Sequence, residues 1–161
     1  MQENQGVCYW AVQLDGSADP PVVVTVDTAP CEVWLPLAPS FSEFVYCQIW
    51  DYAPMSARCE AQEPEFTPET LAFLRSKFQE GPATYGWPGS QNYRFTTPWG
   101  RLLIWHADNS GADWFLRASN HGDLEHLLCA VWQCGTLTKT LRGYDHEGEA
   151  CLQRVRRVKV T

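Results

Sequence analysis

VVVTVDTAPCEVWLPLAPSFSEF, residues 22–44, decides the fold of this chain, because LLIWHADNSGADWFLRASNHGDL, residues 102–124, follows the same plan eighty positions later. The two stretches align from residue 20 to residue 44 without a gap. A repeat of this kind indicates one packing unit used twice. The matched pairs are Trp34 and Trp114, Ala38 and Ala118, Glu43 and Asp123, and Phe44 and Leu124.

Each copy predicts three strands followed by a helix. Alternating and β-branched runs predict the strands. A capping-box pattern, Ser40-Phe41-Ser42-Glu43, predicts where the first helix begins. The expected strands are 7–14, 21–26 and 32–37 in the first copy, and 93–96, 101–106 and 113–117 in the second. The expected helices are 40–52, with an apolar face of Phe41, Phe44, Val45, Ile49 and Tyr52, and 121–133, with Leu124, Leu127, Leu128, Val131 and Trp132.

The segments outside the two copies carry weaker signals. Residues 53–64 are polar and predict an irregular connection, whereas Thr67 and Pro68 predict a third helix over 67–80. Leu71, Leu74 and Phe78 are its expected buried face. Residues 82–91, rich in Gly and Pro, predict a loop, and residues 136–160 predict a C-terminal hairpin.

Together these elements predict an α+β domain in which helices pack on an antiparallel sheet built from two β-β-β-α repeats. We expect a single domain with related units at about 7–52 and 91–133, joined by the helix-containing segment 53–90 and followed by the hairpin 136–160. The pattern leaves open whether the two units share one sheet or form two.

Composition limits the function classes. The 161 residues carry a net charge of −7, with a pI near 5.0, which disfavours nucleic-acid binding because phosphate contacts need clustered Lys and Arg. The exception is a basic tail that alternates with Val, which predicts a terminal strand with a solvated basic face; it contains Arg154, Arg156, Arg157 and Lys159. No apolar run approaches the roughly 20 residues of a membrane helix.

Cysteine usage points to a reducing compartment. The chain has seven Cys, an odd number, and its first residues are polar and resemble no signal peptide. We therefore expect a cytoplasmic protein with reduced thiols.

One segment resembles a known family. The residues that carry the likeness are Glu3-Asn4-Gln5-Gly6-Val7, Trp10, Asp19-Pro20-Pro21-Val22, and Ser40, Phe41, Glu43 and Phe44. Over residues 2–50 the chain resembles the SUKH superfamily, which includes bacterial toxin-immunity proteins and fungal cell-wall regulators. In that family a helical segment precedes the Glu-Asn-Gln stretch, and this sequence begins without it.

The resemblance implies a non-catalytic protein-binding module, because immunity proteins of this class block a toxin by occupying its surface. An acidic protein suits a basic toxin partner, since opposite charges steer association. The acidic candidates for such an interface are Asp51, Glu60, Glu63, Glu65, Asp108 and Asp113. Simple solvation of these carboxylates is the alternative explanation.

An aromatic cluster supports a second hypothesis. Trp87, Trp99 and Trp105 lie close to Gly and Pro residues. They could line a pocket for a sugar or a flat metabolite, in a binding protein or an unrecognised enzyme. Closure of the core under a long loop is the structural alternative.

Signals for catalysis, metals and cofactors are weak. The spacing of His121, His126, Cys129 and Cys134 matches no common zinc pattern, and no nucleotide or nucleophile motif occurs. We therefore expect neither a metal nor a cofactor, and no enzyme. A homodimer formed by pairing of edge strands, with residues 151–160 as the edge, is a further hypothesis.

Overall fold

The computed structural model describes residues 8–26, 33–53, 55, 57–63, 66–85, 90–107, 111–132, 134 and 137–159. It is an α+β structure with antiparallel sheets, as predicted. The chain divides into two compact units. Residues 1–53 and 82–92 make up the first unit, and residues 54–81 and 93–161 make up the second.

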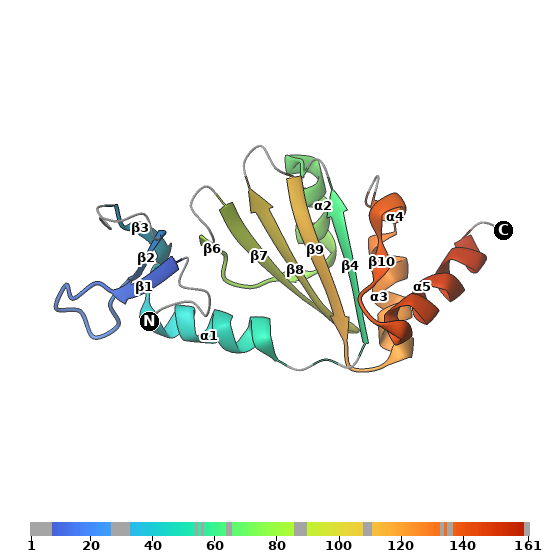
Figure 1. Cartoon of the computed structure of the whole chain (residues 1–161), viewed down its shortest axis with the longest axis horizontal. Coiled ribbons are helices and arrows are strands. Elements are labelled where there is room, and N and C mark those ends of the chain that lie inside the picture. The colour runs from blue at the N-terminus through green and yellow to red at the C-terminus, as the bar shows by residue number, and fades with distance from the viewer. Residues whose placement is uncertain are drawn as a thin grey trace. The chain divides into compact units, whose positions relative to one another are not determined.

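The first unit contains the predicted meander and helix. β1 (Cys8–Val12), β2 (Val22–Val26) and β3 (Leu35–Ala38) form a three-stranded antiparallel sheet in that order. α1 (Phe41–Tyr52) follows, and β6 (Thr84–Tyr85) also belongs to this unit. Figure 1 shows β1, β2, β3 and α1 in blue to cyan and β6 in green. The core contains Val22, Val24, Leu37, Ala38 and Phe44, with Trp10 packed edge-on to Phe44 at 5.3 Å between ring centroids.

α1 begins where the sequence predicts but buries a different face. The Ser40 side chain accepts a hydrogen bond from the Glu43 amide at 3.2 Å, so the Ser half of the capping box is confirmed. The predicted apolar face is confirmed for Phe44 but wrong for Phe41, Ile49 and Tyr52, which are exposed. Phe44, Cys47 and Trp50 are the buried residues. Eight of the twelve residues of this helix are apolar or aromatic and lie on all sides of it, so hydrophobicity alone does not select the face.

The second unit is built on a larger antiparallel sheet with the strand order β10-β4-β9-β8-β7-β5. Its strands are β4 (Ala57–Glu63), β5 (Gln79–Glu80), β7 (Ser90–Thr97), β8 (Gly100–Ala107), β9 (Gly111–Ala118) and β10 (Arg142–Gly143). β7 starts within the first unit, where Asn92 pairs with Thr84 of β6, and continues into the second. Its helices are α2 (Pro68–Lys77), α3 (His121–Val131), α4 (Leu137–Thr140) and α5 (His146–Lys159).

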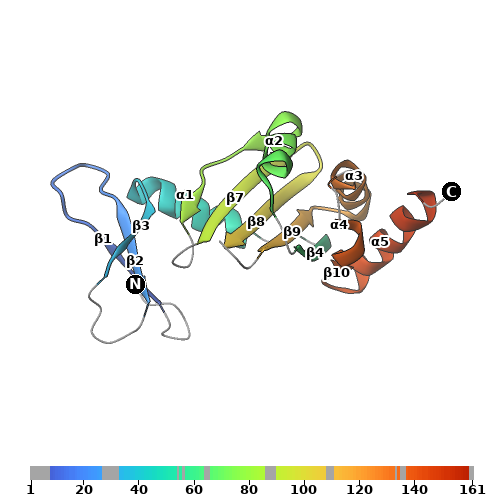
Figure 2. The ribbon, with the colours of Figure 1, turned by 90° about the horizontal axis from the view of Figure 1, so that it is seen from above.

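α2 and α3 cover one face of this sheet, as Figures 1 and 2 both show. Alternate residues of β9 are buried on that face, including Trp114 and Leu116. The predicted stripe of α3 is confirmed for Leu124, Leu127, Leu128 and Val131, which are all fully buried. Asn120 caps α3 by accepting a hydrogen bond from the Asp123 amide at 2.9 Å.

Two sequence predictions are wrong in this unit. Residues 57–63 form β4, not an irregular connection, because they pair along their whole length with β9. The predicted hairpin over 136–160 consists of α4, β10 and α5. The buried residues of this segment are Cys151, Leu152 and Val155, which have the spacing of one helix face. The alternation of Val with Arg and Lys suggested a strand instead. The basic tail is therefore a helix face, and residues 151–160 cannot supply the edge strand expected for a homodimer.

The 80-residue offset reappears in element boundaries. β3 and β9 end at Ala38 and Ala118, and α1 and α3 are capped by Ser40 and Asn120. The surroundings differ, because β1–β3 form a separate sheet while β7–β9 lie inside the larger one. Within the described residues, no helix is long and apolar enough to span a bilayer.

Candidate functional site: an acidic unit with an apolar pocket

The charge of the chain is divided unequally between the two units. By sequence, the first unit contains seven Asp and Glu residues and no Lys, Arg or His. The second contains twelve acidic and twelve basic residues, so its formal charge is zero. The whole net charge of −7 therefore belongs to the first unit. The seven acidic residues are Glu3, Asp15, Asp19, Asp27, Glu32, Glu43 and Asp51.

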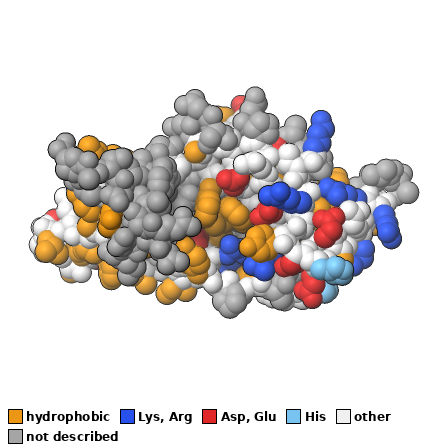
Figure 3. Space-filling view, in the orientation of Figure 1, with side chains coloured by type: hydrophobic (Ala, Val, Ile, Leu, Met, Phe, Trp, Pro, Cys, Tyr) orange, Lys and Arg blue, Asp and Glu red, His pale blue; other side chains and the backbone are white. Residues whose placement is uncertain are grey.

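The surface view agrees with this division. Figure 3 shows Lys and Arg side chains gathered over the second unit, whereas the side chains drawn for the first unit are mainly hydrophobic. Apolar side chains and uncompensated carboxylates therefore occur together on the first unit.

Hydrogen bonds hold two of these carboxylates in the ionised form. The Asp19 carboxylate accepts one hydrogen bond from the Ser42 hydroxyl and another, of 2.9 Å, from the Ser42 amide. These bonds hold the pKa of Asp19 below its ordinary value. Asp15 accepts a bond from the Ser17 amide at 2.9 Å, and its pKa is likewise lowered by Ser17. Asp19 also fixes the β1–β2 connection to the first turn of α1, where a helix favours negative charge.

A pocket of about 420 Å³ opens in the same unit. Its walls come from the start of β2, from β3, and from β6 and β7. The lining residues are Gln13, Pro21, Val22, Val23, Pro36, Leu37, Ala38, Pro39, Ala83, Tyr85 and Gln91. None of them is charged, so the pocket suits an apolar group. We call it the proline-lined pocket.

The β1–β2 connection borders this pocket. The amide of Gln13 donates to the carbonyl of Pro21 at 2.9 Å, which closes the connection between these two lining residues. Asp15 and Asp19 lie within that closed segment. The segment that carries these two carboxylates therefore begins and ends at residues that line the pocket.

The outer side of α1 adds exposed apolar surface. Phe41, Ile49 and Tyr52 fall on one side of the helix and are 45%, 68% and 78% exposed. A contiguous group of large exposed apolar side chains is typical of a protein-interaction surface. We call these three residues the α1 outer face.

The acidic residues proposed from sequence are scattered. Asp51 is half-buried on α1 of the first unit, and Asp113 is half-buried on β9 of the second. Glu60 pairs with Arg142 at 2.9 Å, also in the second unit. Glu65 and Asp108 lie outside the described residues.

Glu63 is a correction to the predicted interface. Its side chain is on the buried face of β4, only 4% exposed, and it accepts a hydrogen bond from the Thr140 hydroxyl of α4. A buried carboxylate with a structural partner cannot meet an approaching protein. Its place on the helix-covered face follows from pairing with β9, which the sequence did not predict.

The predicted Trp cluster is not one site. Trp99 lies in the β7–β8 turn and stacks on His126 of α3, with centroids 5.9 Å apart. Trp105 alternates with buried Ile104, so it projects from the opposite face of the sheet, where it contacts Phe115 at 4.8 Å. Trp87 lies outside the described residues. A pocket lined jointly by Trp99 and Trp105 is therefore excluded.

Sequence reasoning missed Asp15, Asp19, Glu43 and the proline-lined pocket. A signal was present, since residues 1–53 contain no basic residue, but a single net charge for the chain conceals it. No sequence motif marks the pocket, because its lining residues come from segments that are far apart in the chain.

Metal binding finds no support in the geometry. Among the described residues, no group of three His, Cys, Asp or Glu side chains could hold an ion. His121 instead pairs with Glu147 of α5 at 3.1 Å, and Cys129 and Cys134 are free thiols.

Comparisons with protein-family models, with curated proteins and with solved structures found no match to this chain.

Proposed function

We propose that this protein is a binding module for a basic protein, and that the first unit is its recognition surface. The observation that carries the proposal is the charge of −7 on a unit without a single basic residue. Such a unit cannot neutralise itself, and its field attracts a positively charged partner.

The apolar features of the same unit supply the other half of an interface. Interfaces typically place a few apolar anchors at the centre and charged groups at the rim. The proline-lined pocket can receive an anchor side chain, while Asp15 and Asp19, in the connection between Gln13 and Pro21, pair with Lys or Arg of the partner. The α1 outer face extends the apolar contact area.

The resemblance to SUKH immunity proteins supports a narrower form of the proposal. The stretch that carries it, residues 2–50, lies entirely within the first unit. A basic toxin is then the partner, and the protein neutralises it by covering its surface without catalysis. The five Cys side chains that the structure describes are thiols outside any disulfide, which supports a cytoplasmic location for that encounter.

The experiment is co-expression with the products of neighbouring reading frames, followed by affinity measurement on any complex. The test variant Asp15→Asn with Glu43→Gln removes two charges from the first unit. The matched control, Glu69→Gln with Asp113→Asn, removes two from the second. Because rim charges act mainly on the association rate, the test variant should slow association by roughly three- to tenfold at low salt.

The control variant should associate at the wild-type rate, and the difference between variants should shrink as salt screens the charges. Equal effects from the two variants, or a complex indifferent to salt, would contradict recognition by the first unit.

A further inference from the structure

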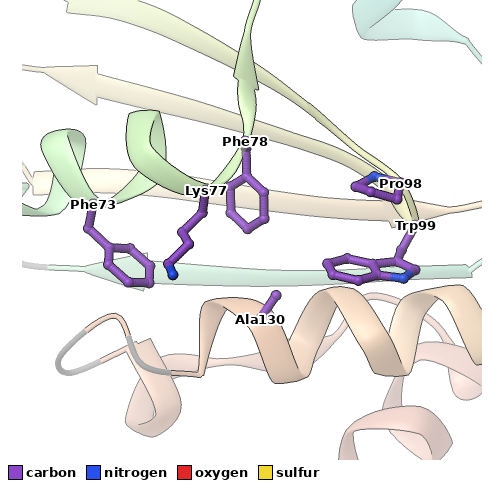
Figure 4. Close-up of a pocket in the computed structure, with 6 residues that line it drawn as sticks. All are labelled: Phe73, Lys77, Phe78, Pro98, Trp99 and Ala130. Atoms are coloured by element: carbon purple, nitrogen blue, oxygen red, sulfur yellow. The ribbon is translucent and has the colours of Figure 1, made fainter.

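A second pocket, of about 250 Å³, lies wholly in the second unit between α2 and α3. Figure 4 shows the aromatic rings of its wall and the Lys77 side chain extending among them toward α3. The lining residues are Phe73, Lys77, Phe78, Pro98, Trp99 and Ala130. We call it the aromatic pocket.

The walls of the aromatic pocket are held by local hydrogen bonds. The Phe78 amide donates to the Leu74 carbonyl at 2.9 Å and ends α2 with the Phe78 ring buried. The Thr97 hydroxyl accepts from the amides of Trp99 and Gly100, at 3.1 and 2.9 Å, and so fixes the β7–β8 turn. Stacking on His126 then orients the Trp99 ring. The site needs little ordering when a ligand enters.

Lys77 is an exposed cation at this pocket, without an ion pair to any described carboxylate. The last turn of α2 contains two basic residues, and Arg75 is engaged by Glu80 through two hydrogen bonds of 2.7 and 2.9 Å. Lys77 has no ion-pair or hydrogen-bond partner within the described part of the chain. A ligand can therefore take its ammonium group without displacing a protein carboxylate.

The chemistry of the lining selects the ligand. Among the lining side chains, the Lys77 ammonium and the Trp99 indole N–H carry the only polar hydrogens, and no side chain supplies an oxygen acceptor. A sugar would find no side-chain acceptor for its hydroxyl donors among these residues. A ligand that brings only acceptors avoids this mismatch, and three aromatic rings favour a flat apolar body.

We propose that the aromatic pocket binds a small aromatic carboxylate. The ring lies among Phe73, Phe78 and Trp99, and the carboxylate accepts hydrogen bonds from Lys77 Nζ. A volume of about 250 Å³ is below the common range for drug-sized ligands, so one or two fused rings fit. All residues that line this site belong to the second unit.

The test uses 2-naphthoate and its neutral isostere 2-naphthamide as probes, titrated against the full chain by calorimetry and ligand-observed NMR. Wild-type protein should bind the carboxylate below about 1 mM and roughly fivefold more tightly than the amide, a ratio typical of one partly exposed ion pair. Lys77→Met, which keeps the apolar stem, should abolish this preference.

Two further variants separate the site from general effects. Lys139→Met removes an exposed Lys from α4, outside the pocket lining, and should preserve the preference. Ala130→Met fills the pocket and should weaken both probes by at least tenfold, with an unchanged circular dichroism spectrum. The proposal is overturned if neither probe binds below several millimolar, if both bind equally to wild type, or if Lys139→Met abolishes the preference as Lys77→Met does.

Discussion

Replacing Gly148 by Ala tests the docking of α5 on β4, the part of the fold that differs most from the sequence prediction. Gly148 is buried in the first turn of α5. Its amide donates to Asp145 at 2.8 Å, and its carbonyl accepts from the Cys59 thiol at 3.4 Å. A Cβ atom at this position would overlap the backbone carbonyl oxygen of Arg58 on β4. Because the overlapping atom belongs to the backbone of β4 and not to a flexible side chain, α5 must shift to relieve the overlap.

The expected cost follows from this overlap. Restoring an ordinary separation requires a displacement on the order of 1 Å or more, since nonbonded atoms need roughly 3.5 Å. Overpacking of this kind costs about 1–3 kcal/mol, and the weakened Cys59 contact adds up to about 1 kcal/mol. The better helix propensity of Ala returns about 1 kcal/mol. The net expectation is a loss of about 2 kcal/mol, or roughly 4–8 °C in Tm.

Gly122→Ala is the matched control, because Gly122 also lies in the first turn of a helix, α3. Its added Cβ would meet only Asn120 Oδ1, at an ordinary contact distance of 3.4 Å. This variant should gain about 0.5–1 kcal/mol. Urea and thermal unfolding, followed by circular dichroism, measure both variants. If Gly148→Ala proved as stable as Gly122→Ala, α5 would not lie against Arg58 and the reasoning would be refuted.

Two further predictions concern the core and its thiols. Leu128→Ala should lower the free energy of unfolding by about 2–5 kcal/mol, because the Leu128 side chain is fully buried. Ile49 is 68% exposed on α1, so Ile49→Ala should change the free energy of unfolding by less than about 0.5 kcal/mol. Urea unfolding measures both variants. Burial raises the pKa of the Cys59 thiol from an ordinary value of 9.0 to about 12. The unfolded chain therefore releases this proton near pH 9 while the folded protein retains it, so stability should fall as pH rises from 9 toward 12, by up to about 1.4 kcal/mol per pH unit. Urea midpoints at pH 8, 9 and 10 should fall less steeply for Cys59→Ala than for the wild type, and parallel slopes would count against the burial of this thiol.

The local signals in the sequence predicted the structure where backbone chemistry is decisive. Ser40, Thr67 and Asn120 each cap a helix at the expected position, because a side-chain oxygen satisfies an amide that the helix leaves free. The β-branched run at 22–26 forms a strand as expected. These outcomes depend on neighbouring residues and need no knowledge of distant contacts.

The wrong predictions concern segments whose structure is decided by partners elsewhere in the chain. The sequence of β4 is polar and predicted no strand, but β4 forms one because β9 supplies its hydrogen-bond partners. α5 alternates Val and Arg like a strand, yet it buries Leu152 and Val155 as a helix. The candidate site shows the same limit, since Trp99 and Trp105 are near neighbours in sequence but lie on opposite faces of one sheet.

The sequence by itself determined the α+β class, the caps, most strands and the uneven distribution of charge, because these follow from composition and from interactions within a few residues. Only the tertiary structure decided which face of α1 is buried, where Glu63 and the Trp residues project, and how distant segments enclose the two pockets. Burial and pocket formation depend on which surfaces meet, and that is a property of the packed chain.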